Sequence, residues 1–289
     1  MLKATGLALG GGVLAAGTAT AHGEGVEGDS GEVISLGNGE AHAYTEHGRG
    51  MLSAVGVRFD AAALQGLPEE PADWPPEGVP EGTPFSVVHR PELPTGYTGR
   101  FDHVTLDWNP GGHEPEGLYT HPHFDFHFYL LDEETVAAIP PGVAEYEIPA
   151  DLMPAGTHYA SDVGPNAVRG VVPAMGEHLV SMPASMPAVP GEDGWSVYIW
   201  GAYDPDGDGA GQLTFMEPMV TVEYLQTLMG DGSADTEAAV VIPMPRRFLK
   251  AGAYPKTMYV RYHAHDDTFT VSLEEFALFR GYGRRGWHR

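Results

Sequence analysis

The sequence predicts an all-β protein, an antiparallel β-barrel or sandwich with two or three short helices, and three observations support this. Short apolar or alternating runs recur along the chain and are separated by residues that favour turns. Glycine and proline supply 39 and 25 of the 289 residues, which is enough for many turns between short strands. No repeat with a period of roughly 20–50 residues is present, so neither a solenoid nor a propeller is expected.

The predicted elements follow one another along most of the chain. Runs typical of strands cover residues 34–59, 85–89, 103–108, 118–131, 167–172, 177–182, 195–203, 213–216, 257–263 and 269–276. Short helices are predicted at 61–67, 133–139 and 222–229, because Asp60 and Asp132 are suitable N-caps and Gly230 closes the third helix. Pro218 is expected to end the strand that begins at residue 213, since proline cannot donate a hydrogen bond within a sheet.

The chain divides into four predicted segments, beginning with an export signal at residues 1–21. Lys3 precedes a mildly apolar stretch that ends in Ala19-Thr20-Ala21, a small-x-small cleavage pattern. The first six residues resemble the part of a twin-arginine signal that follows the arginine pair, so the signal is expected to be a truncated one. Residues 22–31 predict a flexible tether, 32–279 a single β-barrel-like domain and 280–289 a basic tail. We therefore expect an exported protein, located extracellularly or in the cell envelope.

The composition restricts the classes of partner and chemistry. The chain has 40 Asp and Glu residues against 15 Lys and Arg, a net charge of −25. Nucleic-acid binding is not expected, because it needs a basic surface. The charge favours a salt-adapted protein, since repulsion is screened over roughly 3 Å in 1 M salt. The lack of cysteine excludes disulfides and thiolate ligands, and no apolar stretch approaches the roughly 20 residues of a transmembrane helix.

The segment His-Pro-His-Phe-Asp-Phe-His-Phe-Tyr at residues 121–129 is the expected chemical centre. Successive side chains of a strand point to opposite faces, so the segment separates into two faces. The apolar face carries Pro122 and three phenylalanines, which predicts a core face. The polar face carries His121, His123, Asp125, His127 and Tyr129. Three imidazoles and a carboxylate so close together are not typical of an ordinary solvated surface.

The spacing of these histidines predicts a metal site. Alternate residues of a strand lie about 6.6 Å apart, so the side chains of His121 and His123 can converge on one ion. His127 lies about 13 Å beyond His123 in a regular strand and can join them only if a bulge or bend shortens the path. His178 is the expected fourth ligand. Imidazole ligands favour Zn, Cu or Fe over Mg or Ca, and Mn is also considered.

Further polar residues are expected near the same site. The candidates for contacts to the ligands or for acid–base chemistry are His113, Glu114, Asp125, Tyr129 and Glu217. The same residues leave an alternative open, in which Asp125, Glu114 and Glu116 satisfy a histidine-rich polar cluster that holds no metal.

A weaker calcium candidate is formed by Asp204, Asp206 and Asp208. They have the Asp-x-Asp-x-Asp-Gly spacing of a calcium loop, but its twelfth position is Phe215 rather than Glu. No helices are predicted beside the loop, so an acidic hairpin turn is favoured over a calcium site.

Two family resemblances accompany these motifs. The His-x-His pair, the ligand position four residues later and a distant histidine after Pro173 and Gly176 together resemble the metal motifs of the cupin superfamily, with His127 where that family usually has Glu. The resemblance implies a cupin-like fold and metal site. The runs at 37–40, 108–115, 121–129, 173–178 and 215–219 resemble a family of uncharacterised prokaryotic secreted or envelope proteins typified by a Thermus protein. This second resemblance implies a β-barrel-like domain over most of the chain and no particular activity.

Two functions from different classes remain open at this point. The first is an exported metal-binding protein, in its most specific form a cupin-like metalloenzyme with a small-molecule ligand. The second is a non-enzymatic binding or assembly protein of the envelope, whose histidines order a polar core or the interface of a homo-oligomer. Metal content separates the two.

Overall fold

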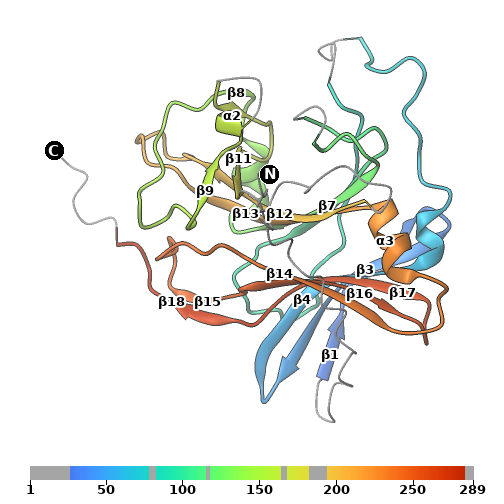
Figure 1. Cartoon of the computed structure of the whole chain (residues 1–289). Coiled ribbons are helices and arrows are strands. Elements are labelled where there is room, and N and C mark those ends of the chain that lie inside the picture. Colours follow the sequence, from blue (N-terminus) through green and yellow to red (C-terminus); the bar gives the residue numbers. More distant parts are fainter. Residues whose placement is uncertain (1–26, 78–82, 115–117, 164–167, 182–193, 284–289) are drawn as a thin grey trace, which may run out of the picture.

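The computed structural model describes residues 27–77, 83–114, 118–163, 168–181 and 194–283. Within them, two antiparallel sheets lie face to face as a β-sandwich (Figure 1). The outer strands of one sheet do not pair with those of the other, so no closed barrel forms in the described part of the chain. The all-β prediction is confirmed, in its sandwich form. The predicted export signal lies outside the described residues.

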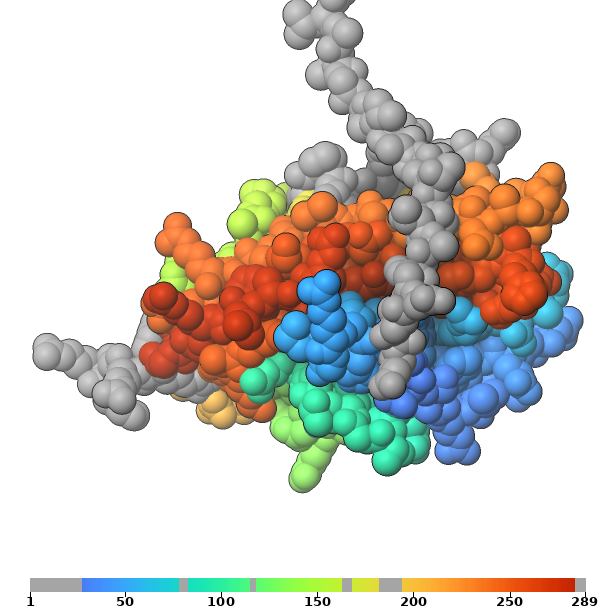
Figure 2. Space-filling view, turned by 90° about the horizontal axis from the view of Figure 1, so that it is seen from below, coloured from blue at the N-terminus to red at the C-terminus, as the bar shows by residue number. Residues whose placement is uncertain are grey.

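Sheet A joins the two ends of the described chain. Its order is β1-β3-β4-β17-β16-β14, and β2 pairs with β3. Figure 2 shows segments from near the N-terminus, in blue, beside segments from near the C-terminus, in red. The bounds are β1 (Glu27–Ser30), β2 (Ile34–Leu36), β3 (Gly39–Gly48), β4 (Met51–Asp60), β14 (Thr236–Val241), β16 (Thr257–His263) and β17 (Thr268–Glu274).

Sheet B carries the histidine-rich segment at its centre. Its order is β5-β6-β7-β13-β12-β11-β9, and every pairing is antiparallel. The bounds are β5 (Val87–His89), β6 (Val104–Asn109), β7 (His123–Tyr129), β9 (Thr157–Tyr159), β11 (Glu177–Ser181), β12 (Ser196–Tyr203) and β13 (Gln212–Thr221). Strands β7 and β13 are therefore covered by hydrogen-bonded neighbours on both sides.

Smaller elements surround the two sheets. The paired strands β8 (Gly142–Val143) with β10 (Gly170–Val171), and β15 (Gly252–Tyr254) with β18 (Ala277–Phe279), form two short ribbons. The helices are η1 (Ala61–Leu64), α1 (Glu133–Ala137), α2 (Ala160–Val163) and α3 (Val222–Met229). As expected, Asp132 caps α1 through a 2.9 Å hydrogen bond from the Thr135 amide, and Gly230 ends α3. None of the described helices is long and apolar enough to cross a membrane.

The phenylalanine face of β7 packs into the core between the sheets, as its alternation predicts. Phe59 of β4 lies 5.9 Å from Phe124 and 6.2 Å from Phe126, measured between ring centroids. Phe59 also stacks on Phe269 of β17 at 5.5 Å. These rings are at most 1% exposed, and burial of each contributes roughly 1.5–3 kcal/mol. The same contacts fix which face of β7 points away from sheet A.

Three local predictions differ from the structure. Residues 27–30 form β1 within the range predicted as a tether, because their backbone pairs with β3. The first helix is a single 3₁₀ turn, and the Asp60 carboxylate accepts a hydrogen bond from the Glu40 amide instead of capping that turn. Pro218 does not end a strand but lies inside β13, opposite Tyr198 of β12. On the β7 side the paired residues of β13 pass directly from Met216 to Met219, and between them the proline has no N–H to donate.

Candidate metal centre

A row of polar side chains crosses the face of sheet B that points away from sheet A. On β7 this face carries His123, Asp125 and His127, and all seven residues of the strand are buried. Strand β6 places Asn109 opposite His123, Asp107 opposite Asp125 and Thr105 opposite His127. Across β13, the pairs Met216–Phe128 and Met219–Asp125 set the register that brings Glu217 opposite His127. Antiparallel pairing therefore concentrates imidazoles and carboxylates on one buried face.

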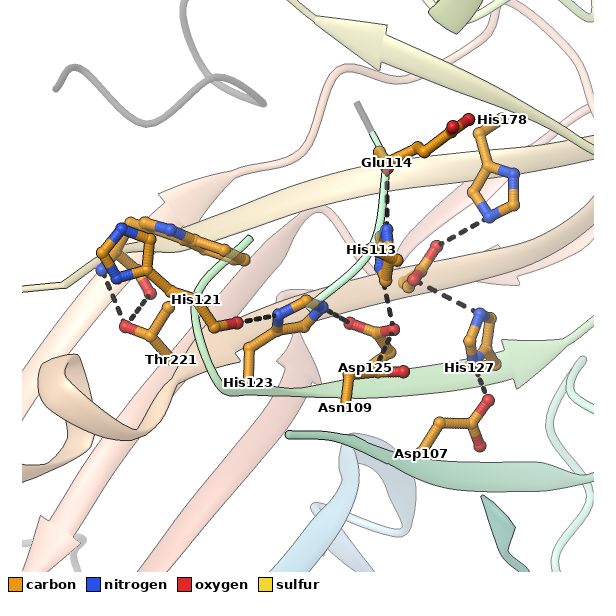
Figure 3. Close-up of polar contacts among 12 residues, drawn as sticks. Asp107, Asn109, His113, Glu114, His121, His123, Asp125, His127, His178 and Thr221 are labelled. Carbon is orange, nitrogen blue, oxygen red and sulfur yellow. Dashed lines mark hydrogen bonds and ion pairs between the residues drawn. The ribbon is translucent and has the colours of Figure 1, made fainter. Parts of the chain in front are cut away.

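The first group of potential ligands consists of His127, His178 and Glu217. His127 Nε2 lies 3.3 Å from Glu217 Oε1, and His178 Nε2 lies 3.8 Å from Glu217 Oε2. Each residue offers one ligand atom, and the three atoms all lie within 4.8 Å of one another. His127 and His178 point toward a common carboxylate from β7 and β11 (Figure 3). The distances suit a small inward movement of the side chains onto an ion at roughly 2.0–2.2 Å.

Gly201 and Phe215 create the space between the two histidines of this group. Gly201 of β12 pairs with His178 on one side and with Phe215 on the other. A Cβ at residue 201 would lie 2.1 Å from the Phe215 ring, so only glycine at this position leaves room for the ring. That ring packs edge-on against His127 at 4.8 Å and against His178 at 5.4 Å. Both imidazoles are thus held against one apolar wall.

The second group consists of His113, His123 and Asp125. His123 Nε2 lies 3.1 Å from Asp125 Oδ1, and His113 Nε2 lies 3.2 Å from Asp125 Oδ2. Their ligand atoms also lie within 4.8 Å of one another. His113 precedes β7 in the chain, and its amide donates to the Tyr119 carbonyl oxygen at 2.9 Å. Gly112 permits this contact, since its φ is +69° and a Cβ would lie 2.1 Å from that carbonyl oxygen.

The Nδ1 atoms of three histidines face oxygen atoms, which fixes how the rings present their Nε2 atoms. His113 Nδ1 lies 2.8 Å from the Glu114 carbonyl oxygen, and His123 Nδ1 lies 2.6 Å from the His121 carbonyl oxygen. A carbonyl only accepts, so both Nδ1 atoms carry the hydrogen. His127 Nδ1 lies 3.4 Å from Asp107 Oδ2. In all three rings Nε2 faces a carboxylate, which is the orientation found in histidines that bind metals.

Burial and charge act in opposite directions on the groups at this face. Burial lowers the pKa of His127, but Glu217 and Asp107 outweigh it and raise that pKa to about 9. Burial likewise opposes protonation of His113, and Asp125 raises the pKa of His113 to about 9. Burial lowers the pKa of His178, which favours the neutral ring that a metal requires. The carboxylates therefore create a field that attracts cations, whether protons or metal ions.

Several buried atoms of the two groups have no hydrogen bond. They are His123 Nε2 and Asp125 Oδ1 in one group, and His127 Nε2 and Glu217 Oε2 in the other. Each approaches its partners without the geometry of a hydrogen bond. Buried polar atoms are normally satisfied, so acceptor atoms that converge without a hydrogen bond fit a cation between them. The residues present thus fit a metal ion at either group.

The remaining predicted site residues lie in other surroundings. His121 precedes β7 and belongs to neither group; its Nδ1 is 4.0 Å from Glu223 Oε1. Glu114 is exposed and contributes only its carbonyl oxygen to His113. The Tyr129 hydroxyl donates to the Ala174 carbonyl oxygen at 3.2 Å. The structure therefore places the four predicted histidine ligands apart: His127 and His178 in one group, His123 in the other, and His121 outside both.

The acidic turn at 204–208 has the hydrogen bonds of an ordinary turn. Asp204 accepts from the Gly209 amide at 2.7 Å, and Asp208 accepts from the Ala210 amide at 3.0 Å. Asp204, Asp206 and Asp208 belong to neither of the two groups found among the described residues.

Three residues of β6 belong to the site although the sequence did not indicate them. Asn109 Nδ2 donates to Asp125 Oδ2 at 2.8 Å, and Asp107 and Thr105 face His127 Nδ1. The only available signal was that Thr105 and Asp107 alternate with apolar residues in the predicted strand 103–108, which Asn109 directly follows. It showed which side chains share a face but not that β6 lies beside β7.

Comparison of the chain with protein-family models, curated proteins and solved structures finds no match. The interpretation of the site therefore depends on its own geometry and chemistry.

Proposed function

We propose that this protein binds a divalent transition-metal ion through His127 Nε2, His178 Nε2 and one oxygen of Glu217. The observation that carries the proposal is the Glu217 carboxylate, which is 1% exposed and lies between two imidazole nitrogens. Oε2 of this carboxylate has no hydrogen bond. An ionised carboxylate in such a place needs a compensating cation, and two neutral imidazoles complete a ligand set for one.

The donor set favours particular metals. Two imidazole nitrogens and one carboxylate oxygen suit Zn²⁺ or Fe²⁺, and Cu²⁺ and Mn²⁺ are weaker candidates. Mg²⁺ and Ca²⁺ prefer oxygen ligands alone. Three protein ligands leave at least one coordination position for water or for a small-molecule ligand. This open position supports a metalloenzyme of the cupin-like kind as the most specific form of the proposal.

Asp107 supports the ligand role of His127. Its Oδ2 faces His127 Nδ1 at 3.4 Å, and Asp107 is 2% exposed. A carboxylate beside the distal nitrogen of a metal-binding histidine helps to orient the ring and makes it a stronger donor. Burial raises the pKa of Asp107 to about 6, so this carboxyl group is mostly ionised at neutral pH.

A polar core without metal is the second candidate function, and one observation favours it. His127 lies between two buried carboxylates, Asp107 at 3.4 Å and Glu217 at 3.3 Å, so a protonated ring can compensate part of their charge. In this case the network orders the face of sheet B in a non-enzymatic binding or assembly protein of the envelope. Such networks are stable only when their members are satisfied.

Elemental analysis separates the two functions. The protein is purified without added chelator, loaded with Zn²⁺, freed of excess metal and analysed beside Glu217→Gln and His178→Ala. The control is His265→Ala, which removes an imidazole that is 98% exposed at the tip of the β16–β17 hairpin. We expect each site variant to bind one zinc ion fewer than the unchanged protein, and the control to bind as much as the unchanged protein. Zinc content that none of the substitutions changes would refute the metal proposal and favour the polar core.

Export is proposed from the sequence pattern of residues 1–21. N-terminal sequencing of the protein from its native source tests this. A mature chain that begins at His22 is the expected result, and a chain that retains residues 1–21 would contradict it.

A further inference from the structure

We infer that the protein holds a second divalent transition-metal ion, between His113 Nε2, His123 Nε2 and the Asp125 carboxylate. The inference extends the proposed function, because it makes one face of β7 a row of two metal sites. It rests on its own ligands, since none of these three residues belongs to the group around Glu217. The two sites can therefore be filled and emptied separately.

The hydrogen positions on the two histidines carry the first step of the argument. Both Nδ1 atoms donate to backbone carbonyl oxygens, at 2.8 Å for His113 and 2.6 Å for His123. A neutral ring then has its lone pair on Nε2. His113 Nε2 makes a 3.2 Å hydrogen bond with Asp125 Oδ2, whereas His123 Nε2 faces Oδ1 of the same carboxylate at 3.1 Å without one. Lone pairs on Nε2 and on the carboxylate oxygens would repel each other at these distances, so a cation, either a proton or a metal ion, has to lie between them.

The surroundings of Asp125 favour a metal ion as that cation. Asp125 is 4% exposed and His123 is fully buried, so water cannot compensate the carboxylate. Asn109 Nδ2 donates to Oδ2 at 2.8 Å and fixes the carboxylate plane. Asp125 Oδ1 and His123 Nε2 remain without a hydrogen bond, which leaves two ligand atoms directed at one point. Two imidazoles and one carboxylate are the donor set of many Zn²⁺ and non-haem Fe²⁺ sites.

Aromatic side chains enclose this second group. The Trp195 ring lies 5.1 Å from the His123 ring, and the Tyr119 ring lies 5.8 Å from the His113 ring. The two imidazoles meet edge to face at 4.7 Å. Such an apolar wall lowers the local dielectric and strengthens attraction between a cation and Asp125. The side chain of His113 is 23% exposed, so an ion can enter the site past this residue.

The two sites lie along a single strand but share no ligand. Asp125 and His127 are two residues apart on β7 and point to the same face, about 6.6 Å from each other along the backbone (Figure 3). Ions bridged by a common ligand lie about 3.5–4 Å apart. We therefore expect two separate mononuclear sites whose charges interact, rather than a bridged pair.

Zinc stoichiometry tests the inference. The full chain is stripped with a chelator, loaded with Zn²⁺ and titrated calorimetrically, and bound zinc is measured by elemental analysis. We expect two ions per chain for the unchanged protein, one for His113→Ala, one for His178→Ala and none for the double variant. His265→Ala is the control and retains two. Circular dichroism verifies that each variant is folded. His113→Gln, which keeps a polar side chain in the loop, replaces His113→Ala if the latter does not fold.

The outcomes distinguish this inference from the proposed function. One ion that His178→Ala abolishes and His113→Ala retains would overturn the second site and leave the first intact. One ion that His113→Ala abolishes and His178→Ala retains would place the metal at Asp125 and refute the Glu217 site. No bound zinc in the unchanged protein or in any variant would refute both metal sites.

Discussion

Glu217 lies directly across the β7–β13 pair from His127, and its Oε1 is 3.3 Å from His127 Nε2. Both residues are 1% exposed. Their opposition depends on the register of two central strands, which Phe128 and Asp125 fix on either side. A one-residue slip would turn Glu217 toward the core between the sheets, so the fold and the site depend on the same register.

Replacement of Glu217 by glutamine is expected to weaken zinc binding at this group by at least about 100-fold, because the amide keeps the volume but removes the charged ligand. Competition titration against a chelator of known affinity measures the loss. Glu134→Gln, on the exposed side of α1, is the matched control and should bind zinc as the unchanged protein does. Equal affinity in both variants would show that Glu217 is not a ligand.

Replacement of Asp107 by asparagine is expected to weaken zinc binding by roughly 10–100-fold without abolishing it. The asparagine can still face His127 Nδ1 but carries no charge, so it orients the ring less firmly. The same competition titration measures the effect, and the stoichiometry should not change. A lost ion, rather than a weakened one, would mean that Asp107 is itself a ligand.

His121 and His178 give opposite expectations that test how the histidines are grouped. His178→Ala should remove an ion, whereas His121→Ala should leave zinc content unchanged, since His121 lies outside both groups. Elemental analysis of the two purified variants is sufficient. Loss of metal in His121→Ala would support the site of four histidines that the sequence spacing predicts.

The elements of the fold could largely be predicted from local sequence. The alternation of phenylalanine with polar residues in 123–129 identified both faces of β7, and Asp132 and Gly230 marked helix ends that the structure has. Pro218 does not end its strand as predicted. The prediction from the missing N–H does not consider which neighbouring strand that N–H would face. Whether the strands form a sandwich or a closed barrel depends on which strands far apart in the sequence pair with each other.

The site could be predicted only in part, for the same reason. His127, His178 and Glu217 were each candidates, but β7, β11 and β13 are brought together by long-range pairing. The His-x-His spacing directed attention to His121, which precedes the strand and does not share its regular alternation. His113 reaches Asp125 through a loop whose path depends on Gly112, and spacing alone does not predict such a path.

The pH dependence of stability should report the charge of His127 in the metal-free protein. Its folded-state pKa of about 9 lies above the unfolded value of about 6.5. The charged ring therefore adds stability that is fully present below about pH 6.5 and is lost as the pH rises through about 9.

Denaturant unfolding of the chelator-stripped protein and of His127→Gln measures this contribution. The difference in unfolding free energy between the two is expected to be on the order of 3 kcal/mol larger at pH 6 than at pH 10. His265→Gln, at an exposed site, should show no such dependence. A difference that stays constant from pH 6 to pH 10 would mean that His127 is not charged in the folded protein.

Salt is expected to stabilise this protein, because the chain has a net charge of −25 and its excess carboxylates repel one another. Repulsion between exposed carboxylates extends over about 10 Å in 0.1 M salt and only about 3 Å at 1 M. The melting temperature should therefore rise by several degrees between 0.1 and 2 M KCl, as followed by circular dichroism. Sucrose at matched viscosity is the control for effects that do not depend on charge. A melting temperature that is flat or falls with KCl would contradict salt adaptation, since screening would then have no repulsion to relieve.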